Sequence, residues 1–558
     1  MNETVQTDVL ICGAGPCGLM MALELGRRGI RTLLIDAKPG TAFNPQANAT
    51  QARTMEHFRR LGLSTKIRSL GLPGDHPTDI AYFTRFYAHE LARLRLPTAR
   101  QAVEAIEQMG GSWSAAELPH RISQKYVEAA ILEQVKQCPS VDVRFSHQMI
   151  RHEDTGAGVQ AQALDTQRSH QFEVQAQFLF AADGARSATR HALGFAWEGE
   201  TAVRRDFMGG KMFAVYFRCP AFYERMPHDR AWMYVSVNAE RRALLATVDG
   251  QGEFALHAAI HENEDAEQWG EDMARKVIAQ AIGEPLPMEI LSARTWLAGH
   301  ALYAQHFQHG RVFLGGDAAH LFTPTGGLGY NTAVEDAINL AWKFAHVIQG
   351  KASSKLLDTY EAERKPLAKR NTRYARQFAD SVGLFAATPL LEAQGAAADE
   401  ERARASQHLN AHVRMEFNIP GITFGGRYDD SNAIVSDGTL PPPDSANTYV
   451  PSACPGGRPP HFWLAKGDSL FDHFGPEWTL LVLGSIDQAL EQARLHWESN
   501  SQAMGLKLKV LHLDREDVRA AYEAPLVLIR PDHVVAWRGD VNQSPQLIWD
   551  RILGFNPA

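Results

Sequence analysis

The stretch from residue 8 to residue 36 constrains the fold of this chain more than any other part of the sequence. Asp8–Cys12 (DVLIC) is an apolar run typical of a buried parallel strand. Leu19–Arg28 then repeats apolar residues at helical spacing, and Thr32–Ile35 forms a second short apolar strand that ends at Asp36. Strand, helix and strand in this order predict a βαβ unit.

The turn between the first strand and the helix carries a GxGxxG pattern, formed by Gly13, Gly15 and Gly18 in GAGPCG. Gly13 allows a tight turn, Gly15 lets the backbone approach a pyrophosphate, and Gly18 lets the helix pack closely on the strand. The N-terminus of the helix attracts negative charge, and Asp36 is placed to accept hydrogen bonds from ribose hydroxyls. The sequence therefore predicts a dinucleotide site at this turn.

Length and composition narrow the remaining possibilities. A chain of 558 residues exceeds one ordinary core, so we expect two or three domains. The net charge of −8, without a block of lysine or arginine, argues against nucleic acid or an anionic membrane surface as a partner. No run reaches the roughly 18 apolar residues that span a bilayer, and residues 1–7 do not begin a signal peptide. Five cysteines without a CxxC pair fit a reducing compartment, so we expect a cytoplasmic protein with a small-molecule partner.

Two further loops begin where a predicted strand ends. Asp183 and Gly184 follow the apolar run Glu173–Ala182, and Asp317 follows the buried run Arg311–Leu314. The second loop continues through a glycine-rich segment, GGLGYN, directly into a predicted helix. An aspartate at a strand end can bind a polyol hydroxyl, and the helix N-terminus beyond the glycines can stabilise negative charge on a ring. This layout suits a flavin.

Period-two alternation dominates the segment from Lys211 to Val248, which predicts an inserted antiparallel sheet. The string GAGVQA from Gly156 nearly repeats the first glycine pattern, but no helical pattern follows it, so we interpret it as a hairpin loop. Helices are predicted over the segments Thr54–Leu61, Ser123–Gln137, Glu267–Ile282, Thr332–Ile348 and Leu357–Phe378.

The alanine-rich segment Gln394–Arg404 and the proline-rich segment Asp437–Ala446 are candidate boundaries. Beyond about Ser452 the pattern predicts a separate α/β unit. Its expected strands are Trp478–Leu483, Leu508–Leu513, Leu526–Arg530 and Val534–Trp537.

Taken together, GAGPCG, DGARSATR and GDAAHLFTPTGGLGYN, in this order and spacing, resemble the FAD-dependent aromatic hydroxylases, the family of phenol and para-hydroxybenzoate hydroxylases. The likeness covers Thr7–Tyr374, and the remainder resembles the thioredoxin-like C-terminal domain of the phenol hydroxylase branch. It implies an α/β fold: a Rossmann-like FAD-binding domain with an inserted antiparallel-sheet substrate domain, and a C-terminal thioredoxin-like α/β domain. Cys454 stands alone there, so we expect no dithiol chemistry.

The expected division follows from this likeness. The FAD-binding domain, with excursions into the substrate domain, takes residues 1–200 and returns with its helices over 301–400, while the substrate domain takes 201–300. Residues 401–450 are expected to be a linker, and 451–558 the thioredoxin-like domain.

The resemblance also implies which residues hold the cofactor. The expected contacts are Gly13, Gly15 and Gly18 with the FAD pyrophosphate, Asp36 with the adenosine ribose, Gln124 and Gly329 with the bound FAD, Asp317 with the ribityl chain, and the backbone of Tyr330 and Asn331 with the isoalloxazine ring. Asp183 and Gly184 belong to a motif tied to FAD and to pyridine-nucleotide binding.

One segment departs from the family pattern. Arg53 is retained in the segment that returns along the flavin, and we count it among the cofactor-binding residues. Gln46 stands where the family commonly has an arginine, which leaves the pyridine-nucleotide contact near this position open.

The reaction implied by the resemblance is reduction of FAD by NADPH or NADH, capture of dioxygen as a flavin hydroperoxide, and transfer of one oxygen atom to a phenolic or related aromatic ring. Tyr216 and Tyr234 of the inserted sheet could hydrogen-bond a phenol oxygen, although aromatic residues on alternating strands more often belong to the core. No catalytic base is assigned. His257 and His261 are interpreted as a solvated helix face rather than a metal site, and we expect His320 to pack or hydrogen-bond within its motif.

Other functions are compatible with parts of the sequence. An NAD-dependent dehydrogenase uses the same βαβ unit, but it leaves Asp183-Gly184 and the long glycine motif unexplained. A non-enzymatic flavin-binding protein would use the C-terminal domain to recruit partners. A flavin-dependent halogenase lacks support because the WxWxIP string is absent. A homodimer is an open alternative to a monomer.

Overall fold

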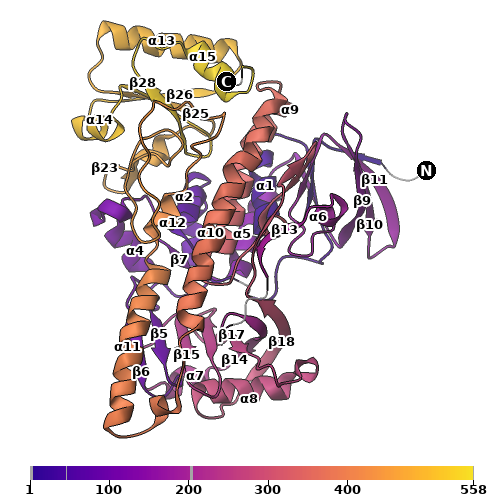
Figure 1. Cartoon of the computed structure of the whole chain (residues 1–558). Coiled ribbons are helices and arrows are strands. Elements are labelled where there is room, and N and C mark those ends of the chain that lie inside the picture. Colours follow the sequence, from indigo (N-terminus) through magenta and orange to yellow (C-terminus); the bar gives the residue numbers. More distant parts are fainter. Residues whose placement is uncertain (1–3, 46, 202–204, 206, 557–558) are drawn as a thin grey trace.

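The computed structural model describes residues 4–45, 47–201, 205 and 207–556 (Figure 1). Its central layer is a six-stranded sheet in the order β20-β21-β12-β2-β3-β8, parallel throughout except for the edge strand β20. The strands are β2 (Val9–Cys12), β3 (Thr32–Asp36), β8 (Val141–Phe145), β12 (Phe178–Ala181), β20 (Gln308–His309) and β21 (Val312–Leu314).

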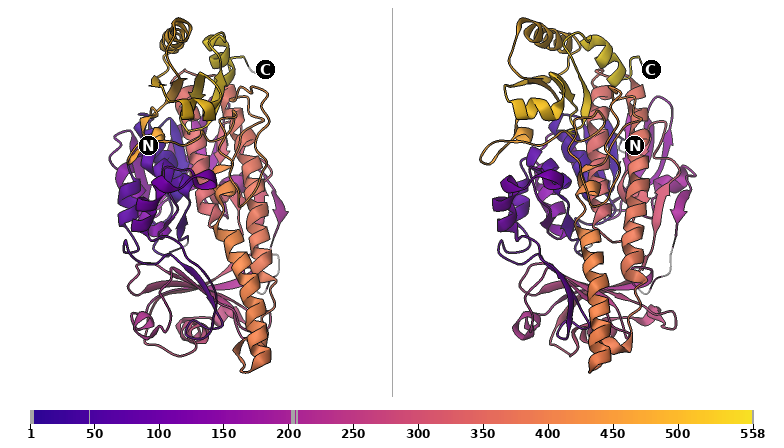
Figure 2. Two further views of the ribbon diagram at one scale, coloured as in Figure 1. Left: turned by 90° about the vertical axis from the view of Figure 1, so that its left-hand side faces the viewer. Right: turned by 60° about the vertical axis from the view of Figure 1, so that its left-hand side comes forward.

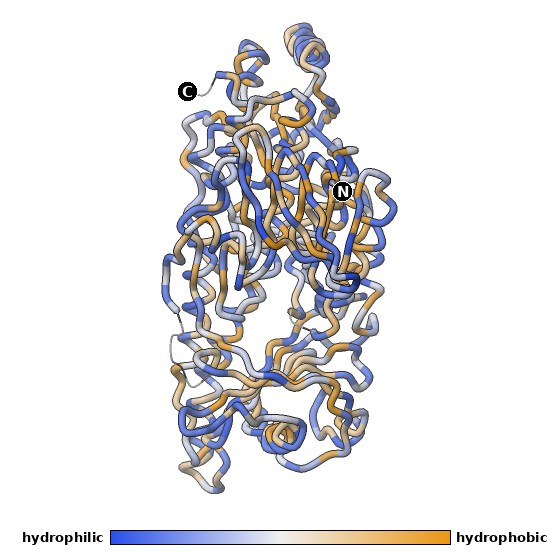
Figure 3. Tube along the Cα trace, turned by 90° about the vertical axis from the view of Figure 1, so that its right-hand side faces the viewer, coloured by the Kyte–Doolittle hydropathy of each residue, from blue (hydrophilic) through white to orange (hydrophobic). Residues whose placement is uncertain are grey.

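The predicted βαβ unit is confirmed as β2, helix α1 (Pro16–Arg27) and β3. The helix begins three residues before the predicted start, because Pro16 takes its first position, where a missing N–H costs nothing. Helices α1, α5 (Gln124–Val135) and α9 (Leu328–Ile348) pack together, and their apolar residues form one core with the strands. Orange hydrophobic segments gather along strands in the interior of the upper part of the molecule in Figure 3.

A four-stranded sheet, β1-β11-β10-β9, flanks the central layer. Its three later strands are antiparallel, and the turn after β9 carries Gly156 at φ +77°, which confirms the hairpin loop. The bounds are β1 (Thr4–Gln6), β9 (His147–Asp154), β10 (Val159–Asp165) and β11 (His170–Ala176).

The inserted sheet has seven strands in the order β18-β14-β17-β16-β15-β5-β6. Four of them lie outside the predicted segment: β17 and β18 follow it in the chain, and residues 80–94 add β5 and β6, with β5 parallel to β15. Helices α7 (Ala221–Arg225) and α8 (Glu271–Ile282) cover one face. The strands are β5 (Ile80–Phe83), β6 (Glu90–Leu94), β14 (Gly210–Arg218), β15 (Met233–Ser236), β16 (Ala243–Thr247), β17 (Glu253–Ala259) and β18 (Glu289–Ala298).

Two long helices, α10 (Thr359–Gly383) and α11 (Ala396–Phe417), lie along the molecule and reach the inserted sheet (Figures 1 and 2). The expected boundary at Gln394–Arg404 is therefore wrong, because helix α11 runs through it. The expected linker from residue 401 is wrong for residues 401–417, which belong to the same helix. Alanine, glutamate and arginine in this segment favour a helix, and the helix buries one face, including Ala405 and Leu409. A short helix, α12 (Pro420–Phe424), follows; residues 425–462, which include the proline-rich segment, contain neither helix nor strand.

The remaining elements are short connections around these layers. They are β4 (Ala49–Thr50), α2 (Ala52–Arg60), α3 (Ser64–Ser69), α4 (Ala99–Ala105), β7 (His120–Arg121), α6 (Ala188–Ala192), β13 (Trp197–Glu200), β19 (Ala301–Ala304), β22 (His320–Leu321), β23 (Trp463–Ala465) and β24 (Asp468–Ser469), together with single 3₁₀ turns at residues 106–108, 111–113, 266–268, 316–318, 354–358, 389–392 and 470–473. Within the described ranges no helix is long and apolar enough to cross a membrane.

The C-terminal domain is thioredoxin-like, as predicted, with a sheet in the order β26-β25-β27-β28. It lies at the opposite end of the molecule from the inserted sheet (Figure 2). All five cysteines of the chain are free thiols, so this domain has no disulfide. Its elements are β25 (Trp478–Leu483), α13 (Gln488–Ala503), β26 (Leu508–Leu513), α14 (Glu516–Tyr522), β27 (Leu526–Ile529), β28 (Val535–Gly539) and α15 (Pro545–Ile552).

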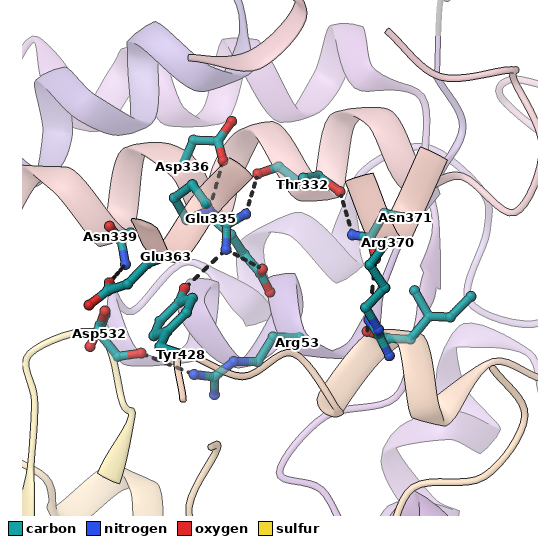
Figure 4. Close-up of polar contacts among 12 residues, drawn as sticks. Arg53, Thr332, Glu335, Asp336, Asn339, Glu363, Arg370, Asn371, Tyr428 and Asp532 are labelled. Carbon is teal, nitrogen blue, oxygen red and sulfur yellow. Dashed lines mark hydrogen bonds and ion pairs between the residues drawn. The ribbon is translucent and has the colours of Figure 1, made fainter. Parts of the chain in front are cut away.

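A buried ionic cluster joins this domain to helices α9 and α10. Glu363 of α10 accepts from the guanidinium of Arg530 at 2.7 and 2.9 Å and from the Nζ of Lys343 on α9 at 2.7 Å. All three side chains are 0 % exposed. Burial alone would raise the pKa of the Glu363 carboxyl, but the two cations hold it well below its ordinary value. Figure 4 shows Asn339 of α9 donating to the same carboxylate.

We predict that Glu363→Gln lowers the free energy of unfolding by about 3–5 kcal/mol, because it leaves Lys343 buried without its counter-charge and Arg530 with Asp532 as its one remaining acidic partner among the described residues. Urea unfolding followed by circular dichroism measures the change. Glu491→Gln is the matched control, since Glu491 pairs with Arg494 on the surface of α13 and should leave the midpoint nearly unchanged. Equal midpoints for the two variants would contradict a structural role for the cluster.

Candidate functional site

A cavity of about 960 Å³ lies where the central sheet and the inserted sheet meet. The three sequence motifs converge on it, because their loops follow the carboxyl ends of the adjacent parallel strands β2, β12 and β21. Nine of the predicted cofactor-binding residues line it: Gly13, Gly15, Asp36, Gln124, Asp183, Gly184, Asp317, Gly329 and Tyr330.

The three glycines of the first motif have different physical roles. Gly13 has φ +105°, and a Cβ there would lie 2.1 Å from the carbonyl oxygen of Ala182. A Cβ on Gly18 would lie 1.9 Å from the carbonyl oxygen of Gly13, so this glycine serves close packing, as predicted, and does not line the cavity. A Cβ built on Gly15 would meet no atom of a more distant described residue within 4 Å, which leaves that space to a ligand.

Asp36 and Asp183 organise the backbone around the cavity. The Asp36 carboxylate accepts from the backbone N–H of Ala14 at 2.7 Å and of Lys38 at 2.8 Å, so it orders the glycine turn from the end of β3. One oxygen of Asp183 accepts from the N–H and the hydroxyl of Thr189 at 3.1 and 3.0 Å. Its other oxygen, Oδ1, is buried without a hydrogen-bond partner among the described residues, which leaves an acceptor for a ligand.

Asp317 and Gln124 both line the cavity. The Asp317 side chain is exposed to the cavity at the end of β21, and enclosure by the surrounding protein raises the pKa of its carboxyl above the ordinary value. Gln124, the first residue of α5, donates to Glu128 at 2.7 Å. Glu128 in turn accepts from the N–H of Ala42 at 2.7 Å, so Gln124 and Glu128 hold the loop at Ala42, which lines the cavity.

Besides Gly18, two predicted contact residues do not line the cavity. Arg53 is buried on α2 and donates to the carbonyl oxygens of Asp532 and His533 at 3.0 and 2.9 Å, so we correct its assignment to a contact with the C-terminal domain (Figure 4). The Asn331 side chain accepts from the N–H of Gln51 at 2.8 Å and donates to the carbonyl of Ala49 at 2.9 Å. The Asn331 side chain therefore holds the backbone of residues 49–51 in place. Gln46 lies outside the described residues.

The inserted sheet forms the opposite wall of the cavity. Strand pairing places Tyr82, Val235, Leu244, His257, Ala214 and Arg294 in one row across six strands, and all six line the cavity. The prediction that His257 lies on a solvated helix is wrong, because this residue is on strand β17. Burial, and then the charge of Arg294, lowers the pKa of His257 to about 4. His261 lies beyond the strand and contacts the carbonyl of Glu240 at 3.0 Å.

The two tyrosines proposed from the sequence differ in placement. Tyr234 belongs to the core, where its oxygen accepts from the N–H of Ala231 at 2.7 Å, and it does not line the cavity. Tyr216 does line the cavity, but its hydroxyl donates to Glu253 and accepts from the Nζ of Lys125 at 2.6 Å. Its hydroxyl is therefore already hydrogen-bonded within the protein.

Helix α11 supplies a site residue that sequence reasoning missed. Glu416 lines the cavity and accepts from the N–H of Gly326 at 2.8 Å, so it holds the glycine-rich loop before α9. Glu416 lies 90 positions after Gly326, so no pattern near it in the sequence indicates this contact. His320, inside the third motif, is fully buried and hydrogen-bonds Asp336 at 2.6 Å, as expected from the sequence.

Comparison with known proteins agrees with this geometry. Residues 6–375 match the family described as an FAD binding domain, and residues 452–554 match the one described as aromatic-ring hydroxylase, C-terminal. A 2,4-dichlorophenol 6-monooxygenase from Cupriavidus pinatubonensis is 31% identical over 96% of this chain and 94% of its own length. A phenol 2-monooxygenase from a Pseudomonas species is 28% identical over 96% of this chain and 91% of its own.

Among solved structures, the rebeccamycin biosynthetic enzyme RebC with reduced flavin covers 100% of both chains with a TM-score of 0.87 and 30% identity. The fold and the cavity thus define a flavoprotein monooxygenase. The chain belongs to the FAD-dependent aromatic-ring hydroxylases, with FAD as its cofactor and NAD(P)H and dioxygen as the co-substrates general to that class. The dehydrogenase and the non-enzymatic flavin-binding alternatives are excluded. The space beside Gly15 and the unpartnered oxygen of Asp183 fit this cofactor.

We predict that Gly15→Ala and Gly18→Ala separate cofactor binding from folding. The methyl group of Gly15→Ala enters only the ligand space, so the apoprotein should keep its stability while FAD affinity falls about tenfold or more. Gly18→Ala instead forces the glycine turn away from α1 and should lower the stability of the apoprotein. Thermal unfolding of apoprotein and FAD titration distinguish the two; unchanged FAD affinity in Gly15→Ala would remove that residue from the site.

Asp36→Ala should weaken FAD binding by about ten- to a hundredfold, because a charged acceptor contributes roughly 1.5–3 kcal/mol. The loss of its two backbone donors also loosens the glycine turn. Titration of the apoprotein by flavin fluorescence provides the measurement. The control is Asp142→Ala on β8, which removes a carboxylate from the surface of the same sheet. Wild-type affinity in Asp36→Ala would count against the proposed ribose contact.

Proposed function

We propose that this enzyme hydroxylates a phenolic or related aromatic compound bound between the motif loops and the inserted sheet. The observation that carries the proposal is the single cavity, which joins the FAD motifs to an apolar wall. Val235, Leu244 and Ala246 supply flat apolar surface on adjacent strands of that wall. Such a surface matches the face of an aromatic ring better than the face of a polar metabolite.

The residues of the chain then have distinct tasks in the reaction. Bound FAD supplies the redox chemistry, since it takes electrons from NAD(P)H and activates dioxygen. Gly13 and Gly15 would hold its phosphate-bearing part, Asp183 would accept from one of its hydroxyl groups, and Asp317 would bind its ribityl chain. Tyr82, Val235 and Leu244 would exclude water around the substrate ring, which favours oxygen transfer to that ring over release of hydrogen peroxide.

Helix α11 completes the enclosure. Glu416 and Phe417 line the cavity from this helix, and Glu416 fixes the loop at Gly326. The position of the substrate relative to the cofactor therefore depends on a helix that lies outside the FAD-binding domain. The pyridine nucleotide has no glycine fingerprint of its own in the sequence, so we infer that it binds transiently at the FAD-binding domain. The five free thiols favour a reducing compartment, and we propose a cytoplasmic location on that ground.

Labelled dioxygen provides the decisive experiment for this function. A panel of phenols and aromatic acids is first screened for compounds that accelerate the anaerobic bleaching of bound FAD by NAD(P)H. With the best compound and ¹⁸O₂, one labelled atom should enter the aromatic product and the other should appear in water. A product oxygen derived from water, or stoichiometric hydrogen peroxide without product, would overturn the proposal.

A further inference from the structure

Three nitrogen-bearing side chains gather at one end of the sheet wall. His257 lies on β17, Arg294 and Trp296 lie on β18, and strand β14 runs between them. Ala214 of β14 is the register partner of both His257 and Arg294. All three nitrogen-bearing residues line the cavity, and the His257 and Trp296 rings meet edge to face at 5.7 Å.

Each of these three side chains has polar atoms without a hydrogen-bond partner among the described residues. His257 Nδ1 and Trp296 Nε1 are buried without any partner in the described part of the chain. The guanidinium of Arg294 likewise forms no ion pair or hydrogen bond with any described residue, and Arg294 is exposed at the cavity. Buried donors are almost always satisfied in folded proteins, so such a cluster indicates that a ligand supplies the missing acceptors.

The chemistry of the cluster restricts the ligand. An indole N–H only donates, and a guanidinium stays protonated and only donates, so the ligand must present acceptor oxygens and negative charge. Planar guanidinium groups match carboxylates through paired hydrogen bonds. Neighbouring strands lie about 4.8 Å apart, so the Cα atoms of Arg294 and His257 are about 10 Å apart across the small Ala214 side chain, which leaves room for a carboxylate.

Nothing else on this wall competes for the charge of Arg294. The carboxylates that line the cavity lie on the loops and helices around it and include Asp36 and Glu416, which accept from backbone N–H groups. The other lining cations are Lys38, in the loop after β3, and Arg186, within the second motif, so both lie on loops of the FAD-binding domain. Arg294 is thus the one charged residue among the cavity-lining positions of the described inserted sheet.

We propose that His257, Arg294 and Trp296 form an oxyanion subsite that binds a carboxylate of the aromatic substrate. The inference rests on the proposed function and refines it: the substrate is an aromatic acid, with its ring on the apolar part of the sheet and its carboxylate at the edge formed by β18. A phosphate of the pyridine nucleotide offers the same chemistry, and the experiment separates the two sources.

The test uses holoenzyme and two matched probe pairs, 1-hydroxy-2-naphthoate with 1-naphthol and salicylate with salicylamide. Dissociation constants come from perturbation of the bound FAD spectrum. In the wild type, at least one acid should bind about tenfold or more tightly than its neutral partner. Arg294→Gln should abolish this preference through loss of affinity for the acid, and Arg294→Lys should retain part of it. Trp296→Phe keeps the ring, loses the N–H, and should reduce the preference several-fold.

Arg225→Gln is the matched control, since Arg225 pairs with Glu284 on the covered side of the sheet and should leave the preference intact. Reduction of FAD by NADPH and by NADH is measured in every variant. Weaker use of the pyridine nucleotide in Arg294→Gln with an unchanged acid preference would assign the subsite to the nucleotide phosphate and overturn the proposal.

The remaining outcomes separate this inference from the proposed function. If neutral phenols accelerate FAD reduction and are hydroxylated, but no acid binds better than its neutral partner, the subsite is refuted and the hydroxylase stands. If no aromatic compound of either kind accelerates FAD reduction or yields product, the proposed function itself fails.

Discussion

The relative placement of the helices and the C-terminal domain depends on the contacts of one buried carboxylate, that of Glu363. It binds Lys343 of α9, Arg530 beyond β27 and Ser431 of the connecting segment, so one charge ties two long helices to the C-terminal domain. Helix α9 begins at the glycine-rich loop of the cavity, and its position is therefore set in part far from the cofactor. Buried ion pairs add little net stability but penalise any arrangement that separates them, which favours one geometry.

Much of the central layer could be predicted from the sequence because its determinants are local. The apolar run of β2, the glycine turn and the helix that follows lie within a few residues of one another, and each element has its own periodicity. Parallel strands bring their carboxyl ends to one edge, so the loops carrying Asp183 and Asp317 could be expected beside Gly15.

The rest of the site depends on contacts between distant residues. His257 and His261 share a face in a helix and also in a strand, since four residues are about one helical turn and also two strand repeats, so their spacing could not decide between them. Arg53 lies 479 positions before Asp532, whose carbonyl it contacts, and nothing near it in the sequence indicates that partner. The sequence of helix α11 resembles that of a linker, because it consists largely of alanine and charged residues and its apolar residues form only a weak stripe.

Strands that are neighbours in the inserted sheet lie far apart in the sequence, so the cavity wall can form only late in synthesis of the chain. Strand β5 leaves the ribosome early, but its neighbour β15 follows some 150 positions later and the lining residue Phe417 much later still. At ordinary rates of translation this delay lasts on the order of tens of seconds. During that time the apolar faces of β5 and β6 have no partner, which makes the growing chain a substrate for chaperones until α11 has been synthesised and has packed against β6.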